Sequence, residues 1–206
     1  MARIGIMGGT FDPIHNGHLV LGSQAYEEYS LDEVWFMPSG QPPHKRDHVI
    51  TDSHDRCEMV RLAIIGRDEF VFSDFEVSTM GYTYTANTLA ALKQHYPEHH
   101  FYFIVGADSL FQLEDWYHPE RVLASVTLLA AGRAYPEASC SIGEQIEYLK
   151  HKYKGNIHSL HSPDIDVSSS MLRTMAAKGE DLTPYLPQPV AAYIQSRHLY
   201  EVSTNG

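Results

Sequence analysis

The sequence predicts an α/β fold, a doubly wound parallel sheet of Rossmann-like architecture with a small helical part at the C-terminal end. Short runs rich in β-branched and aromatic residues alternate with longer amphipathic segments along the chain, which are the periodicities of strands and helices. The connections between these segments are short. Strands that alternate with helices at such spacing are joined by right-handed crossovers and form a parallel sheet with helices on both faces. In a sheet of this kind the ligand crevice lies beyond the carboxyl ends of the strands.

Strands and helices are expected in alternation through the first half of the chain. Pro38 ends the second strand because proline donates no ladder hydrogen bond. Ser53 precedes a segment in which Met59, Leu62 and Ala63 recur at helical spacing, so Ser53 is the expected N-cap of that helix. The expected strands are 3–7, 34–37, 70–72 and 75–77, and the expected helices are 17–29, 53–65 and 85–95.

The second half continues the alternation. Pro119 suits the first position of a helix, where a missing N–H costs nothing. The expected strands are 101–105, 126–130 and 157–160, and helices are expected to begin at 119 and to span 142–153, 168–177 and 190–197. The polar segment 201–206 is expected to be a disordered tail, so residues 1–200 are expected to form a single domain.

The composition restricts the classes of protein. The 206 residues carry 15 Lys and Arg against 26 Asp and Glu, a formal net charge of −11, so nucleic acid, whose binding depends on phosphate neutralisation, is not an expected partner. The longest apolar stretches, around 101–107 and 126–131, fall far short of the ~18 residues that span a bilayer, so no membrane partner is expected. Two cysteines make neither a disulfide framework nor a Cys₄ metal site. A reducing, cytoplasmic location is therefore expected.

The turn after the first strand has the features of an anion site. Gly8 and Gly9 lack side chains where backbone must approach a ligand closely. The helix that starts near Gly17 directs its N–H groups and its positive dipole end to the same place. His15 and His18 are three residues apart and are expected to face one way. The glycines match no dinucleotide fingerprint, and the chain contains no Gly-Lys-Ser/Thr phosphate loop, so a nucleotide site of another kind is predicted.

Five sequence motifs in order carry a family resemblance. Residues 9–18 (Gly-Thr-Phe-Asp-Pro-Ile-His-Asn-Gly-His) resemble the signature of the nucleotidyltransferase superfamily whose hallmark is His-x-Gly-His. The other four are residues 38–45 (Pro-Ser-Gly-Gln-Pro-Pro-His-Lys), 81–85 (Gly-Tyr-Thr-Tyr-Thr), 106–109 (Gly-Ala-Asp-Ser, with Trp116 after them) and 167–173 (Val-Ser-Ser-Ser-Met-Leu-Arg). Together they resemble bacterial nicotinate-nucleotide adenylyltransferases. The resemblance extends from the first strand to about Tyr200.

The resemblance implies an enzyme of NAD biosynthesis that joins ATP and nicotinate mononucleotide, releasing deamido-NAD and pyrophosphate. The 5′-phosphate oxygen of the mononucleotide attacks the α-phosphorus of ATP. That phosphate is already an anion at pH 7, so the reaction requires neither a strong base nor an enzyme nucleophile. Catalysis must then come from alignment and from positive charge around the transferring phosphoryl group.

The resemblance also implies roles for residues at matching positions. The groups expected around the transferring phosphoryl group are His15, His18, Lys45 and Arg173. ATP is expected to contact Gly8, Gly9, Thr10, Phe11, Gly106, Asp108, Arg133, Ser169 and Ser170. The mononucleotide is expected to contact Lys45, Thr83, Tyr84, Thr85, Trp116 and Tyr117. No residue is assigned as a metal ligand: because no cluster of carboxylates forms an obvious cage, Mg²⁺ is expected to arrive with ATP.

Several of these residues have a structural alternative. His15 and His18 can be surface or capping histidines, since the chain has 13 histidines. Lys45 can be a solvated charge, and Asp108 can either bind a ribose hydroxyl or cap the next segment. Arg173 is expected in the first turn of its helix, where a cation opposes the helix dipole, and that structural cost favours a ligand role.

The chain departs mildly from the family pattern. Thr79 stands where the family more often has Arg, which leaves that position without an assigned role, and Thr83, Asn87 and Ser170 replace Ser, Asp and Thr. Competing functions are a pantetheine-phosphate adenylyltransferase, a non-catalytic nucleotide-binding protein of the same fold and a histidine-rich metal-binding protein. A homo-oligomer is compatible with the sequence.

Overall fold

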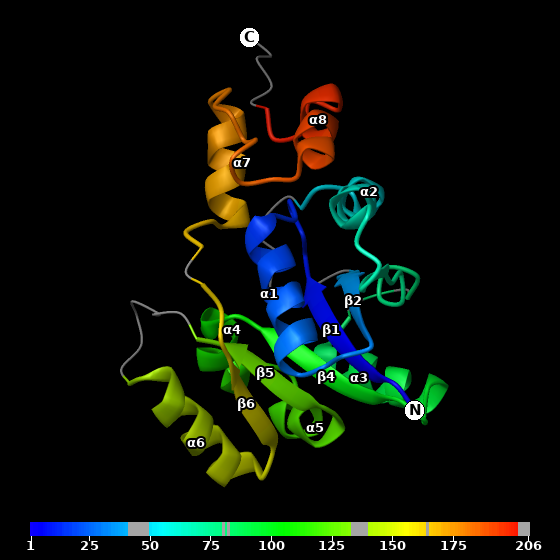
Figure 1. Ribbon diagram of the computed structural model, residues 1–206, viewed down its shortest axis with the longest axis vertical. Helices are drawn as coiled ribbons and strands as arrows, with labels where there is room; N and C mark the ends of the chain where they lie inside the picture. Colours follow the sequence, from blue (N-terminus) through cyan, green and yellow to red (C-terminus); the bar gives the residue numbers. More distant parts are fainter. Residues whose placement is uncertain (41–49, 80, 82, 133–139, 164, 202–206) are drawn as a thin grey trace.

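A six-stranded parallel sheet forms the centre of the protein (Figure 1). The computed structural model describes residues 1–40, 50–79, 81, 83–132, 140–163 and 165–201. The strands are β1 (Arg3–Gly9), β2 (Glu33–Pro38), β3 (Phe70–Phe72), β4 (His100–Val105), β5 (Thr127–Ala131) and β6 (Asn156–Leu160). Their order is β3-β2-β1-β4-β5-β6, and every pairing is parallel. The predicted doubly wound α/β architecture is therefore confirmed.

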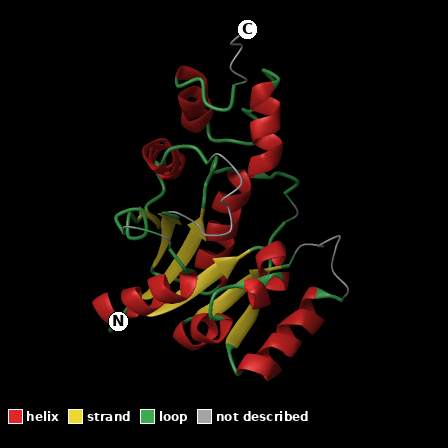
Figure 2. Ribbon diagram, turned by 180° about the vertical axis from the view of Figure 1, so that it is seen from behind, coloured by secondary structure: helices red, strands yellow, loops and turns green. Residues whose placement is uncertain are grey.

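Helices cover both faces of the sheet, as Figure 2 shows from behind. They are α1 (Asn16–Glu28), α2 (Ser53–Ile64), α3 (Thr85–His95), α4 (Ala107–Phe111), α5 (Pro119–Ser125), α6 (Ile142–Tyr153), α7 (Ser169–Ala177) and α8 (Gln188–Ser196), with a short 3₁₀ helix η1 (Leu113–Asp115). The last two helices form the small C-terminal part and stand beyond the carboxyl end of β1, next to α2 (Figure 1).

The sheet separates two apolar cores because successive side chains of a strand point to opposite faces. In β4, Ile104 joins the core under α1 and α2, whereas Phe103 and Val105 join the core under α3 and α5. Leu172 of α7 and Ile194 of α8 belong to the first core. The C-terminal helices are therefore packed against the elements that carry the first turn of the chain.

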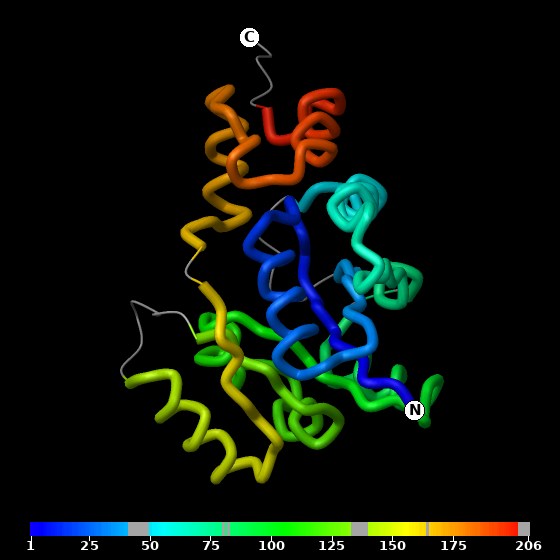
Figure 3. The backbone as a smooth tube through the Cα atoms, viewed as in Figure 1, coloured from blue at the N-terminus to red at the C-terminus, as the bar shows by residue number. Residues whose placement is uncertain are grey.

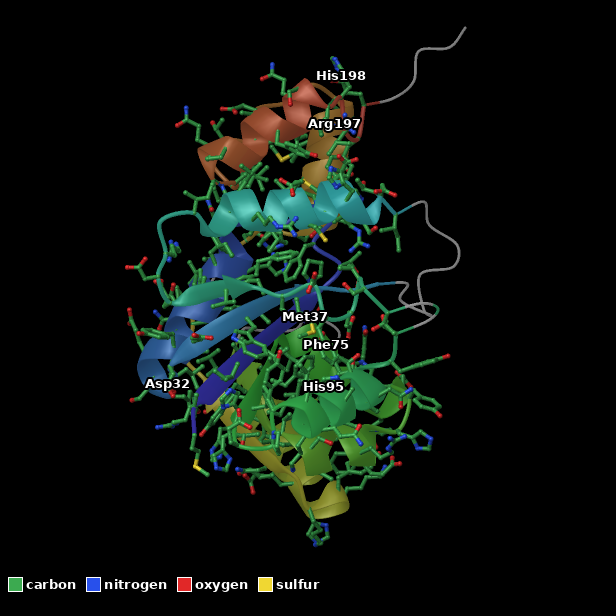
Figure 4. The ribbon with its side chains drawn as sticks, turned by 90° about the vertical axis from the view of Figure 1, so that its right-hand side faces the viewer. Asp32, Met37, Phe75, His95, Arg197 and His198 are labelled. Atoms are coloured by element: carbon green, nitrogen blue, oxygen red, sulfur yellow. The ribbon has the colours of Figure 1, made fainter. Side chains whose placement is uncertain are left out.

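Three details of the predicted elements are wrong. Residues 75–77 are not a strand: the Ser78 N–H donates to the Asp74 carbonyl and the Thr79 N–H to the Glu76 carbonyl, which are the bonds of a turn. Figure 4 shows Phe75 beside Met37, in the core cluster at the carboxyl end of β2. The N-cap of α2 is Asp52, whose carboxylate accepts the His54 N–H at 2.8 Å, and not Ser53. The short helices α4 and η1 were not expected.

Cys57 and Cys140 are both free thiols. Within the described ranges of the chain, no helix combines the length and the apolar character needed to cross a bilayer.

Candidate active site

A cavity of about 520 Å³ opens at the carboxyl ends of the central strands. It lies where the strand order reverses, between β1 and β4, which is the position at which doubly wound sheets bind ligands. Its walls include the end of β1, the turn after β4 and the segment that leads into α7. Of the predicted site residues, it is lined by Gly8, Gly9, Thr10, His15, His18, Thr83, Thr85, Gly106, Asp108, Trp116 and Ser169. The fold thus brings most of the predicted residues to one place.

The turn after β1 forms one wall of the cavity. Gly9 has little room for a side chain, because a Cβ there would lie 3.1 Å from the ring of Phe11. Phe11 itself adopts a positive φ of 51°, a conformation that non-glycine residues rarely take. Its ring is 2% exposed and belongs to the core. Phe11 therefore anchors the turn in the core, and it is not among the residues that line the cavity.

His15 and His18 lie together at the start of α1. His15 is the N-cap residue, and the two rings stack with centroids 3.7 Å apart. The expectation that they face one way is confirmed. The His15 N–H donates to Nδ1 of His18 at 3.2 Å, so a neutral His18 carries its proton on Nε2. The two imidazoles and the positive end of the α1 dipole share one wall of the cavity.

The opposite part of the cavity has apolar and hydroxyl groups. Thr83 and Thr85 lie at the start of α3, and Trp116 follows η1. The Trp116 ring packs edge-on against Phe103 at 6.1 Å. Two residues predicted to contact the mononucleotide, Tyr84 and Tyr117, lie outside the lining. Tyr84 is the N-cap residue of α3, and the two rings are 4.5 Å apart. This wall offers an aromatic face and a helix N-terminus to a flat ring that carries an acidic group.

The turn after β4 adds a carboxylate. Gly106 is the N-cap residue of α4, and Asp108 lies in its first turn. A Cβ at Gly106 would meet Oδ1 of Asp108 at 2.6 Å, so a side chain at position 106 would require that carboxylate to shift. Both residues line the cavity.

Arg173 is half-buried beside the turn after β1 and is not among the residues that line the cavity. It is beyond the first turn of α7, so the predicted position in that turn is wrong. Its Nη1 donates to the Asp12 carbonyl at 2.7 Å, and Ser169 Oγ donates to the Pro13 carbonyl at 2.9 Å. Ser170 is exposed. Lys45 and Arg133 lie outside the described residues.

Arg56 is a buried cation that the sequence reasoning missed. It is 2% exposed, and burial lowers the pKa of its guanidinium. Its Nη1 donates to the carbonyls of Thr10 at 2.8 Å and Ser39 at 2.9 Å, and its Nε to the Thr51 carbonyl at 3.0 Å. The available signal was its spacing, since Arg56 lies on the same face of α2 as the core residues Met59 and Val60.

Glu76 is a second residue that was missed. It lines the cavity, and burial raises the pKa of its carboxyl group, while hydrogen bonds from the Thr88 hydroxyl and the Gly40 N–H oppose that shift. The Thr88 hydroxyl donates to Oε1 at 2.7 Å. Glu76 therefore ties the segment after β3 to α3 and to the end of the turn after β2. The incorrect strand at 75–77 concealed this role.

Comparison with known proteins finds related sequences along almost the whole chain. The cytidylyltransferase-like family model matches residues 6–175. A probable nicotinate-nucleotide adenylyltransferase from Lachnoclostridium phytofermentans is 42% identical over 200 residues, which cover 97% of this chain and 100% of that protein. One from Desulfitobacterium hafniense is 38% identical over 203 residues, covering 97% and 96%.

Solved structures share the fold. The Plasmodium falciparum nicotinic acid mononucleotide adenylyltransferase complexed with NaAD superimposes with a TM-score of 0.78 at 23% identity, covering 97% of this chain and 98% of that one. The same enzyme complexed with APC gives a TM-score of 0.77. Because the family model and the relatives match most of its length, this chain belongs to the cytidylyltransferase-like family and, within it, to the nicotinate-nucleotide adenylyltransferases.

Proposed function

We propose that this enzyme transfers the adenylyl group of ATP to nicotinate mononucleotide, giving deamido-NAD and pyrophosphate. The observation that carries the proposal is one cavity with two chemically different walls. One wall has His15, His18 and the backbone of Gly8–Thr10, which suit phosphates. The other has Thr83, Thr85 and Trp116, which suit an acidic aromatic base. The transfer requires both nucleotides in one space with their phosphates adjacent.

The chain's own groups align and stabilise the reacting phosphates. The mononucleotide phosphate attacks the α-phosphorus, the bond to the β-phosphate breaks, and pyrophosphate leaves with its negative charge. His15 and His18 donate to the oxygens on which charge builds up, and the N–H groups of Gly9 and Thr10 hold the triphosphate. Lys45 is proposed to contact both substrates and Arg133 the triphosphate, from segments outside the described residues.

The remaining assignments follow from position. Asp108, which lines the cavity in the turn after β4, is proposed to accept a hydrogen bond from the ATP ribose. Phe11 and Ser169 contribute at the triphosphate, Phe11 through its backbone, and Ser170 follows at the start of α7. Tyr84 and Tyr117 are proposed to form the rim of the mononucleotide site, because their rings pack together beside Trp116.

Mg²⁺ is proposed to enter with ATP. Among the described residues, no group of three or more His, Cys, Asp or Glu side chains is placed to hold a metal ion, which fits a cation held mainly by the triphosphate. When bound there, Mg²⁺ supplies positive charge to the leaving pyrophosphate.

The free thiols of Cys57 and Cys140 support a reducing, cytoplasmic location.

The direct test is product identification. The protein is incubated with ATP, Mg²⁺ and either nicotinate mononucleotide, nicotinamide mononucleotide or phosphopantetheine, and the products are identified by mass spectrometry. Deamido-NAD as the main product is expected. Dephospho-coenzyme A as the main product contradicts the proposal, and ATP binding without any product indicates a non-catalytic protein.

Arg173→Lys is expected to raise the KM for ATP about fivefold or more and to change the KM for the mononucleotide little. A guanidinium can hold the Asp12 carbonyl with one nitrogen and an ATP phosphate with another, whereas an ammonium lacks that planar fork. Steady-state kinetics with each substrate varied in turn measures the two KM values. Arg197→Lys, on the same C-terminal part but bonded to Asp55, is the matched control. A rise in the mononucleotide KM alone contradicts the assignment.

Trp116→Ala is expected to weaken nicotinate mononucleotide about tenfold and to leave ATP affinity nearly unchanged. Stacking of a base on an aromatic ring contributes roughly 1–3 kcal/mol. The chain has two tryptophans, so Trp35→Phe leaves Trp116 as the single fluorescent reporter. In that background, quenching by nicotinate mononucleotide but not by ATP is expected. Equal quenching by both, or unchanged affinity in Trp116→Ala, places the pyridine ring elsewhere.

A further inference from the structure

The Asp12 carboxylate lies beneath the turn that follows β1 and is held by groups from distant parts of the chain. Asp12 is 5% exposed. Its Oδ1 accepts the Tyr200 hydroxyl at 2.7 Å, and its Oδ2 accepts the Thr51 N–H at 3.3 Å. Burial, together with the Asp12 charge, raises the pKa of the Tyr200 phenol. The hydroxyl therefore keeps its proton and donates a hydrogen bond to the carboxylate.

The backbone of the same turn is held in the same manner. Its carbonyls at residues 10, 12 and 13 accept hydrogen bonds from Arg56, Arg173 and Ser169 respectively. On the C-terminal side, the Asn16 N–H donates to the Tyr185 carbonyl at 2.9 Å. Figure 3 shows the C-terminal part of the chain standing over this turn. These four bonds join the backbone of the turn to α2, to α7 and to the segment before α8.

Tyr200 occupies its place at a conformational cost. Its φ is 68°, in the left-handed region that is unfavourable for a non-glycine residue. Such a conformation persists where surrounding contacts determine it. The contacts here are the bond to Asp12 and the packing of Leu199 and Tyr200 on the core that α1 and α2 share.

From these contacts we propose that Tyr200 is a positioning residue for adenylyl transfer. Its hydroxyl fixes the Asp12 carboxylate, and Asp12 in turn fixes the backbone that leads three residues later to His15. Without the hydroxyl, the buried carboxylate loses a donor and must move toward another. A shift of the turn displaces His15 and the Gly9 and Thr10 N–H groups from the transferring phosphate, and a misplacement of about 1 Å can cost up to ~10²-fold in rate. The proposal rests on the proposed function.

The test compares two tyrosines. Tyr200→Phe removes only the hydroxyl that reaches the turn. Tyr193→Phe is the matched control, because the Tyr193 hydroxyl donates to Oδ1 of Asp55 at 2.8 Å and likewise joins the C-terminal part to the body of the protein. Figure 4 places Arg197, which also bonds to Asp55, at the end of α8 above α2. Both variants lose one O–H···carboxylate bond.

Tyr200→Phe is expected to lower kcat at least tenfold at saturating substrates, with the mononucleotide KM within about twofold of wild type. Tyr193→Phe is expected to lower the Tm by about as much as Tyr200→Phe does, and to keep the wild-type kcat. Equal kcat values in the two variants, or a loss of Tm in Tyr200→Phe without loss of kcat, overturn the proposal.

A second measurement separates this proposal from the proposed function. Hydrogen–deuterium exchange of the peptide covering residues 8–18 reports the order of the turn without any turnover. Faster exchange is expected in Tyr200→Phe and not in Tyr193→Phe. Unchanged exchange overturns the positioning role. If the wild-type enzyme makes no deamido-NAD while the exchange result holds, the proposed function has failed and the support of the turn by Tyr200 stands.

Discussion

Alanine in place of His18, or of His15, is expected to lower kcat by roughly 10²-fold or more, the effect of losing one donor that stabilises transition-state charge, about 2.7–4 kcal/mol. The two rings stack on the cavity wall at the N-terminal end of α1. No enzyme nucleophile or strong base is needed, so the positively polarised groups around the phosphates carry most of the catalysis. The measurement is kcat at saturating ATP and mononucleotide.

His54→Ala serves as the control for both histidine variants. His54 is exposed on α2 and outside the cavity lining, so its replacement should leave kcat unchanged. Circular dichroism and the Tm establish that each variant is folded. A folded His15 or His18 variant with near-normal turnover would identify that histidine as a capping residue only.

Nicotinate mononucleotide is expected to be preferred over nicotinamide mononucleotide by roughly 10²-fold or more in kcat/KM, equivalent to at least about 2.7 kcal/mol. The first N–H groups of α3 have no partner within the helix and carry partial positive charge, so they suit a carboxylate. A neutral carboxamide loses the charge assistance and turns N–H donors toward N–H donors, which a buried site cannot satisfy.

The measurement is kcat/KM for each mononucleotide at fixed, saturating ATP. Glu76 makes the comparison informative, because its carboxyl group also lines the cavity but is bound by the Thr88 hydroxyl. Because Glu76 is hydrogen-bonded within the protein, we expect the N–H groups at the start of α3 to determine which mononucleotide is preferred. Similar efficiencies for the two mononucleotides would refute the carboxylate site, even if adenylyl transfer itself proves correct.

Much of the fold and the centre of the site follow from local sequence patterns. Helices 85–95 and 142–153 are observed with the expected bounds, because their apolar periodicity and caps act within a few residues. The turn at Gly8 and Gly9 is identifiable because glycine at a strand end in a parallel sheet has few other uses. Once the strands are known to be parallel, residues that follow them are expected at one edge.

Local patterns do not reveal which remote groups meet. Arg56, Asp12 and Tyr200 are brought together by tertiary packing, and their importance comes from hydrogen bonds across the fold. The turn over 74–79 was mistaken for a strand because Phe75 and Val77 alternate as strand residues do, while the bonds that close the turn depend on carbonyls of the same segment. The role expected for Arg173 rests on the family resemblance and is favoured by its expected place in the helix, whereas its bond to the Asp12 carbonyl is not foreseeable from spacing.

The bond between Asp12 and Tyr200 joins residues 188 positions apart, and this separation has a consequence for the newly made protein. At about 5–20 residues per second, the ribosome needs roughly 10–40 s to add the residues between them. During that interval β1, its turn and α1 are already synthesised, but the last support of the turn is not. A nascent or C-terminally shortened chain can therefore complete its sheet while its phosphate site stays unfinished. Full activity should appear only after Tyr200 has left the ribosome, later than compact structure.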